Sequence, residues 1–188
     1  PWLTSATASS TANAAHSRRA DGSGRRNRQQ SGPARADSAQ LPGKRLELLK
    51  AMVPALRTVG VLANNTTIDQ VEVVRAAAPR LGLDPVLVNL ARPPYDFRSA
   101  LAQMRRSGAQ ALLVLGSGLW VPHRPAIIGA ALEARLPSMF HNGLWCELGG
   151  LMSYGFNFQD IWRRGAEMVA RVLAGADPAT MPMEQPAR

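Results

Sequence analysis

The feature that most constrains the fold is an unbroken apolar run, residues 111–115, that ends in Gly116-Ser117-Gly118. The run is too short to cross a membrane and too continuous for a strand that faces water on one side. It therefore predicts a parallel strand buried on both faces. Because ligands in open parallel sheets bind just beyond the carboxyl ends of the strands, the loop that follows is predicted to form the floor of a binding site.

Strand-like and helix-like patterns alternate on both sides of this run. Further apolar strands are predicted at residues 58–63, 85–90, 137–141 and 151–154. Apolar residues at helical spacing predict helices before the first strand, between most of the strands and after Asn157, which has capping-box spacing to Asp160. This alternation predicts an α/β fold, in which a parallel sheet carries helices on both faces.

The N-terminal residues have a different composition, rich in Ser, Ala, Gly, Arg and Gln. Residues 1–38 hold six Arg and two Asp, so they supply +4 of the formal net charge of +9. They have almost no large apolar side chains to offset the entropy of ordering. We therefore expect a disordered, low-complexity basic tail at residues 1–41 and an α/β ligand-binding lobe at residues 42–188. The tail shows no helix-turn-helix pattern, so no specific nucleic-acid partner is expected.

Catalytic and metal-binding patterns are not found in the sequence. Ser117 does not lie in a Gly-x-Ser-x-Gly elbow, and no glycine-rich phosphate motif follows a strand. Cys146 is the only cysteine, and with His141 it makes no metal site, because two residues are too few. We therefore expect no catalytic residue, no metal and no cofactor, and a protein that is not an enzyme. No segment has the pattern of a signal peptide or a membrane span, so we expect neither in these residues.

Polar and aromatic residues follow the predicted strands at the points where the strands end. The carboxyl ends of parallel strands share one edge of a sheet, so these side chains are expected to gather there. They suit a small polar or amphipathic ligand, and neighbouring helix N-termini would favour a carboxylate. The candidate ligand-binding residues are Asn64, Ser117, His141, Asn142, Tyr154 and Asn157.

Five short segments, taken together, carry a resemblance to a known family. In chain order they are GKRLELLK at 43–50, TVGVLAN at 58–64, ALLVLGS at 111–117, GGLMSYG at 149–155 and MEQP at 183–186. Over residues 42–186 the chain resembles the substrate-binding proteins of ABC transporters, in the family that includes tryptophan- and tyrosine-binding members. It departs from the family pattern at Asn64-Asn65, where the family often has Asn-Pro. Residues 141–146, His-Asn-Gly-Leu-Trp-Cys, also replace a more acidic and aromatic run.

The resemblance implies a type I periplasmic-binding fold, with two α/β lobes joined by a hinge and a cleft that closes on the ligand. The chain would then be a bacterial fragment that covers mostly the second lobe. Its partners would be a small solute, such as an amino acid or a related amphipathic molecule, and the permease subunits of an ABC import system. Its location would be periplasmic or otherwise extracytoplasmic. The alternatives are an effector-binding domain of a transcriptional regulator with the same fold, or a flavodoxin-like enzyme.

Overall fold

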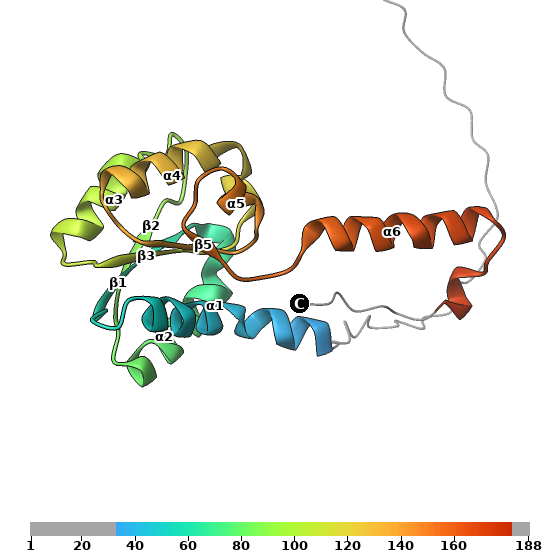
Figure 1. Cartoon of the computed structure of the whole chain (residues 1–188), viewed down its shortest axis with the longest axis horizontal. Coiled ribbons are helices and arrows are strands. Elements are labelled where there is room, and N and C mark those ends of the chain that lie inside the picture. Colours follow the sequence, from blue (N-terminus) through green and yellow to red (C-terminus); the bar gives the residue numbers. More distant parts are fainter. Residues whose placement is uncertain (1–32, 182–188) are drawn as a thin grey trace, which may run out of the picture. The chain divides into compact units, whose positions relative to one another are not determined.

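A computed structural model describes residues 33–181 of the 188-residue chain (Figure 1). Strands and helices alternate along it, and short 3₁₀ turns lie at residues 65–67, 79–81, 118–123 and 178–180. The elements in chain order are α1 (Pro33–Met52), β1 (Thr58–Ala63), α2 (Ile68–Ala77), β2 (Asp84–Asn89), α3 (Phe97–Arg106), β3 (Ala111–Val114), α4 (Arg124–Glu133), β4 (Ser138–Phe140), α5 (Leu144–Glu147), β5 (Met152–Ser153) and α6 (Phe158–Leu173).

The five strands form one parallel sheet in the order β2-β1-β3-β4-β5. Val61 of β1 lies opposite Leu87 of β2 on one side and Leu113 of β3 on the other. The chain runs from β1 outward to β2 and then crosses over β1 to enter β3, so the direction of winding reverses between β1 and β3. In open parallel sheets this reversal leaves a crevice at the carboxyl ends of the two strands, where ligands bind.

Helices cover both faces of the sheet, as the sequence predicts (Figure 1). Alternate strand residues point to opposite faces. Val61 and Leu113 belong to the core under α1 and α2, whereas Leu62 and Leu112 belong to the core under α3 and α4. Residues 111–115 are therefore fully buried along their whole length, which explains why no polar residue interrupts that run. The predicted α/β fold with a parallel sheet is confirmed.

The first helix begins earlier than expected. α1 starts at Pro33 and continues through Pro42, so the boundary that we expected after residue 41 falls inside this helix. The helix can continue through Pro42 because Leu41, before the proline, and Leu46 and Leu49, after it, are all buried. The remainder of the predicted tail, residues 1–32, lies outside the described residues.

Two other helices differ from the sequence expectation. The short helix α5 was missed, because its four residues are too few to show a period. α6 starts after Asn157 as predicted, but none of its side chains is buried among the described residues, although its apolar positions repeat at helical spacing. In the described part of the chain, no helix combines the length and the apolar character that crossing a membrane requires.

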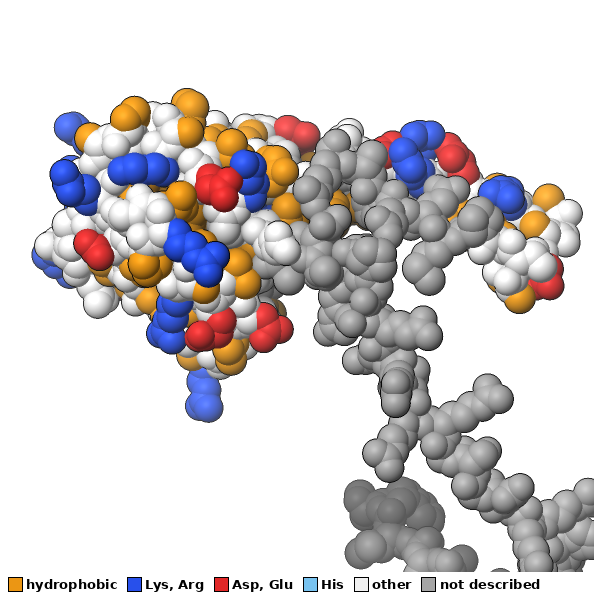
Figure 2. Space-filling view, turned by 90° about the horizontal axis from the view of Figure 1, so that it is seen from below, with side chains coloured by type: hydrophobic (Ala, Val, Ile, Leu, Met, Phe, Trp, Pro, Cys, Tyr) orange, Lys and Arg blue, Asp and Glu red, His pale blue; other side chains and the backbone are white. Residues whose placement is uncertain are grey.

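The surface on the α1 and α2 side carries mixed charge. Lys and Arg side chains lie there among Asp, Glu and apolar side chains (Figure 2). The ion pairs between Lys44 and Glu47 and between Arg75 and Glu72 are exposed, and such pairs contribute little stability.

Candidate ligand-binding site

Asn64 and Ser117 lie at the carboxyl ends of β1 and β3, next to each other. The Asn64 side chain donates from Nδ2 to Ser117 Oγ over 2.9 Å. Its Oδ1 accepts from the backbone N of Thr66 at 2.9 Å and from Thr66 Oγ1 at 2.7 Å. Both Asn64 and Ser117 are buried, at 1% and 7% exposed. The two residues therefore meet at the predicted edge, where their side chains bond to each other and to neighbouring protein atoms.

Gln70 on α2 forms two hydrogen bonds to the loop that follows β3. Its Nε2 donates to the carbonyl oxygen of Gly116 at 2.7 Å, and its Oε1 accepts from the backbone N of Gly116 at 2.9 Å. One side chain thus satisfies both backbone groups of the residue that starts the floor of the site. The sequence analysis missed Gln70, because a glutamine on a helix carries no signal of this use.

A cavity of about 720 Å³ opens at this edge of the sheet. Its lining includes the polar side chains of Arg45, Ser117, Arg124, His141 and Asn142, which we call the polar wall. The lining also includes the apolar side chains of Leu41, Val121, Leu144, Phe156, Phe158 and Trp162, which we call the apolar wall. A volume of this size and a mixed lining are typical of small-molecule sites.

His141 follows β4 and lies near two cations, Arg45 and Arg124. Burial lowers its pKa to about 4, and the positive charges of Arg45 and Arg124 add to the effect. The imidazole is therefore neutral at neutral pH. Its Nδ1 is buried and has no hydrogen-bond partner among the described residues. The hydrogen-bonding capacity of this nitrogen is therefore unused by the described residues.

Arg45 comes from α1 and is only 4% exposed. Its Nε donates to the backbone oxygen of Tyr154 at 2.7 Å, which ties α1 to the segment after β5. Burial lowers the pKa of the guanidinium to about 10, so the group stays charged at neutral pH. The sequence analysis missed Arg45, because a cation on an amphipathic helix is usually solvated.

Arg124 is the first residue of α4 and was also missed. Its guanidinium carbon lies 5.7 Å from the centre of the Trp145 ring, and its Nε is buried without a hydrogen-bond partner among the described residues. A cation at a helix N-terminus opposes the helix dipole, and that position was an available signal.

The six predicted site residues occupy three places. Ser117, His141 and Asn142 line the main cavity, and Asn64 lies behind Ser117. The other two, Tyr154 and Asn157, line a neighbouring hollow of about 420 Å³ that also includes Asn142.

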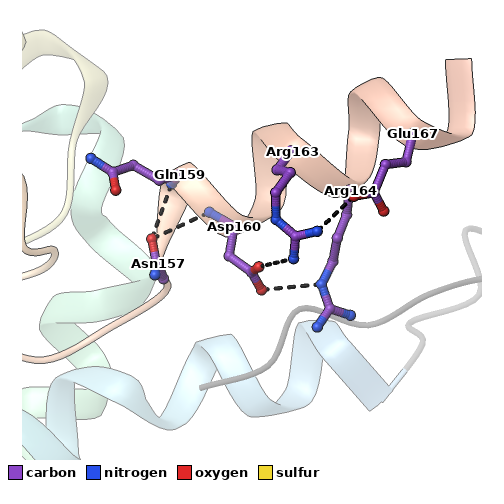
Figure 3. A network of polar contacts seen from close by, with 6 residues as sticks. All are labelled: Asn157, Gln159, Asp160, Arg163, Arg164 and Glu167. Carbon is purple, nitrogen blue, oxygen red and sulfur yellow. Dashed lines mark hydrogen bonds and ion pairs between the residues drawn. The ribbon is translucent and has the colours of Figure 1, made fainter. Parts of the chain in front are cut away.

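Asn157 has a structural task at the start of α6 (Figure 3). Its Oδ1 accepts from the backbone N of Gln159 at 3.1 Å and of Asp160 at 3.3 Å, so it caps the helix. Asp160 accepts from Arg163 at 2.7 Å and from Arg164 at 3.1 Å. The carboxylate is thus engaged with the next turn of α6, and the predicted capping box is present only in its Asn157 half.

The glycines of the GGLMSYG segment allow β5 to pass close to the end of β4. Gly149 has a φ of +100°, which disfavours residues with a side chain. A Cβ on Gly150 would lie 2.7 Å from the Phe140 ring. A Cβ on Gly155 would lie 2.1 Å from the carbonyl oxygen of His141. Close backbone approach next to the cavity is the physical reason for these glycines.

Among residues 33–181, no group of three or more His, Cys, Asp or Glu side chains is arranged to hold a metal ion. The cavity lining offers guanidinium, carboxylate, imidazole, amide and hydroxyl groups. These groups can bind and orient a polar ligand, while the apolar wall covers its hydrophobic part.

Comparison with protein families gives a match over most of the chain. The sequence profile of the family described as ABC transporter substrate binding protein matches residues 36–187. A comparison with curated proteins found no match.

Solved structures with the same fold come from several bacteria. A conserved domain protein from Vibrio cholerae is 21% identical, with a TM-score of 0.64 over 77% of this chain and 50% of that chain. The ABC domain in complex with L-Trp from Streptococcus pneumonia is 25% identical, with a TM-score of 0.63 over 76% of this chain and 48% of that chain. An open, ligand-free substrate binding protein with adhesive properties from Clostridium difficile is 23% identical, with a TM-score of 0.53 over 75% and 48%. The chain spans about half the length of these proteins.

Proposed function

Because the chain belongs to the ABC transporter substrate-binding protein family, we propose that it binds a small solute in the cavity beyond β1, β3 and β4, as part of an import system. The observation that carries the proposal is this cavity. It lies where the winding of the parallel sheet reverses, and both polar and apolar side chains line it. The family match favours binding over the regulator and enzyme alternatives. Permease subunits as partners and an extracytoplasmic location belong to the same proposal.

The lining favours an amphipathic solute. Ser117, His141 and Asn142 contribute polar groups to the lining, and Phe158 and Trp162 contribute aromatic rings. We propose that the first three contact the solute directly and that Asn64 positions Ser117. An aromatic amino acid is the natural first probe, because the Streptococcus pneumonia structure was solved in complex with L-Trp. Tyr154 and Asn157 would border the solute from the neighbouring hollow.

Binding by this chain is expected to be weak. The resemblance implies a two-lobed protein that encloses its ligand, and the chain spans about half the length of the related structures. A solute on one lobe stays partly hydrated, so water competes for each polar contact. The assay must therefore detect millimolar dissociation constants.

The test is an NMR titration of the ¹⁵N-labelled chain with L-tryptophan up to about 10 mM, a concentration suited to affinities near −3 to −4 kcal/mol. Shifts are expected at the backbone amides of Ser117, His141 and Asn142. Val121→Trp should block the shifts, because Val121 lines the cavity and is 48% exposed. Leu119→Trp is the matched control, since Leu119 lies in the same turn, is 45% exposed and is not part of the lining. Shifts that are absent, or that survive Val121→Trp, would contradict the proposal.

A further inference from the structure

The polar wall of the cavity holds two guanidinium groups, those of Arg45 and Arg124. Within residues 40–181, neither Arg45 nor Arg124 forms an ion pair, although both line the cavity. Arg45 is 4% exposed, and its Nε bonds only to a neutral backbone oxygen. A buried charge without a counter-charge costs free energy. A bound anion next to Arg45 would lower that cost.

Arg124 is placed where a cation is unfavourable in the absence of an anion. It starts α4, a helix of ten residues, and the positive end of the helix dipole lies at the same point. The buried Nε has no hydrogen-bond partner among the described residues. An anion at this position would interact favourably with both the guanidinium and the helix terminus.

The two cations line the same cavity and are both close enough to His141 to lower its pKa. Burial, together with the charges of Arg45 and Arg124, lowers the pKa of His141 and keeps the ring neutral. The imidazole therefore adds no positive charge of its own to the lining. Within the described lining, the carboxylate of Asp69 is the acidic group present. At neutral pH the lining thus holds two positive charges against one negative charge, and a net-anionic ligand complements it better than a zwitterion does.

We propose that the cavity selects organic anions, in which a carboxylate is held between Arg45 and Arg124 and an apolar or aromatic body lies along Phe158 and Trp162. The inference rests on the proposed function, and it narrows the ligand to carboxylates without an α-ammonium group. Amino acids enter the same cavity but bind less tightly, because their ammonium group meets an excess of positive charge.

Three probes with one ring system isolate the charge: indole-3-propionate, L-tryptophan and tryptamine. They are titrated into the full 188-residue chain by NMR at low ionic strength, where charge effects are largest. We expect indole-3-propionate to bind about tenfold more tightly than L-tryptophan. Repulsion between the ammonium group of tryptophan and a guanidinium about 6 Å away accounts for a factor of that size at an effective dielectric constant of about 40. Tryptamine is expected to bind most weakly.

Arginine variants assign the effect to the polar wall. Arg124→Gln should weaken indole-3-propionate about tenfold and leave tryptamine unchanged or slightly tighter, because only the anion loses an attraction. Arg80→Gln, which removes the same charge from an exposed residue outside the cavity, should change neither probe. Arg45→Lys keeps the charge of the second cation, so the preference for the anion should remain.

The outcomes separate this inference from the proposed function. If L-tryptophan binds as tightly as indole-3-propionate and Val121→Trp blocks both, the solute site stands and the anion preference is overturned. If Arg124→Gln weakens all three probes equally, the residue contributes shape and not charge, and the preference is again overturned. If no probe shifts the cavity amides at 10 mM, the proposed function fails, and the inference fails with it.

Discussion

Replacing Asn64 by alanine tests how the floor of the cavity is held. The side chain ties the end of β1 to the end of β3 through Ser117 Oγ, and it caps the turn at residues 65–67 through the backbone N of Thr66. Asn64→Ala removes both functions at a position that is 1% exposed. Thr66 Oγ1 makes a second link between the two segments, because it bonds to both Asn64 Oδ1 and Ser117 Oγ.

The size of the effect follows from these bonds. Loss of an N-cap costs about 1 kcal/mol, and loss of a buried hydrogen bond costs about another 1 kcal/mol. Ser117 Oγ keeps its bonds to Leu119 N and to Thr66 Oγ1, so it is not left without a partner. We therefore expect Asn64→Ala to lower the free energy of unfolding by about 2 kcal/mol, which corresponds to about 4–8 °C in Tm for a domain of this size.

The neighbouring residue provides a matched control. Asn65 is exposed, and its side chain makes only long bonds, at 3.3 Å to the Ala91 oxygen and 3.4 Å from Asn89. Asn65→Ala should cost no more than about 0.5 kcal/mol. Urea unfolding followed by circular dichroism measures both variants at constant m-value. Equal costs for the two substitutions would refute the assigned role of Asn64. The double variant of Asn64→Ala and Ser117→Ala is expected to show a coupling energy of about 1 kcal/mol, so additive costs would refute that role as well.

Two further substitutions probe the same edge of the sheet. Gly155→Ala should destabilise the chain by more than about 2 kcal/mol in urea unfolding, because the new Cβ would overlap the His141 carbonyl oxygen. Gly165→Ala is the control, because a Cβ at this position on α6 meets no other atom, and it should stabilise the chain by about 0.5–1 kcal/mol. A Gly155→Ala variant as stable as wild type would disprove the close approach of the Gly155 backbone to His141. The pKa of His141 is lowered from 6.5 to about 4, so the unfolded chain binds the extra proton and stability is expected to fall, by at most about 3 kcal/mol, as the pH drops from 6.5 to 4. His141→Gln should flatten that dependence, and an unchanged pH profile would show that the histidine is not responsible.

The sequence was sufficient to determine the local order of the fold and where its strands end. The apolar run at 111–115 predicted a strand buried on both faces, and β3 lies at the centre of the sheet with helices on each side. The parallel arrangement followed from the alternation of strands and helices, because helices that connect parallel strands must cover the sheet. For the same reason, Asn64 and Ser117 were expected at one edge, and they bond there to each other.

Only the tertiary structure shows which charged side chains line the same cavity. Arg45 lies on α1 and Arg124 on α4, helices on opposite faces of the sheet, and no local pattern indicates that both line one cavity. The course of α1 through Pro42 was also decided by packing, since buried leucines on that helix outweigh the local preference of proline. Periodicity reports which face of an element is apolar, whereas the convergence of two distant cations depends on the strand order and on the crossover from β2 to β3. These are non-local properties, and only the folded chain contains them.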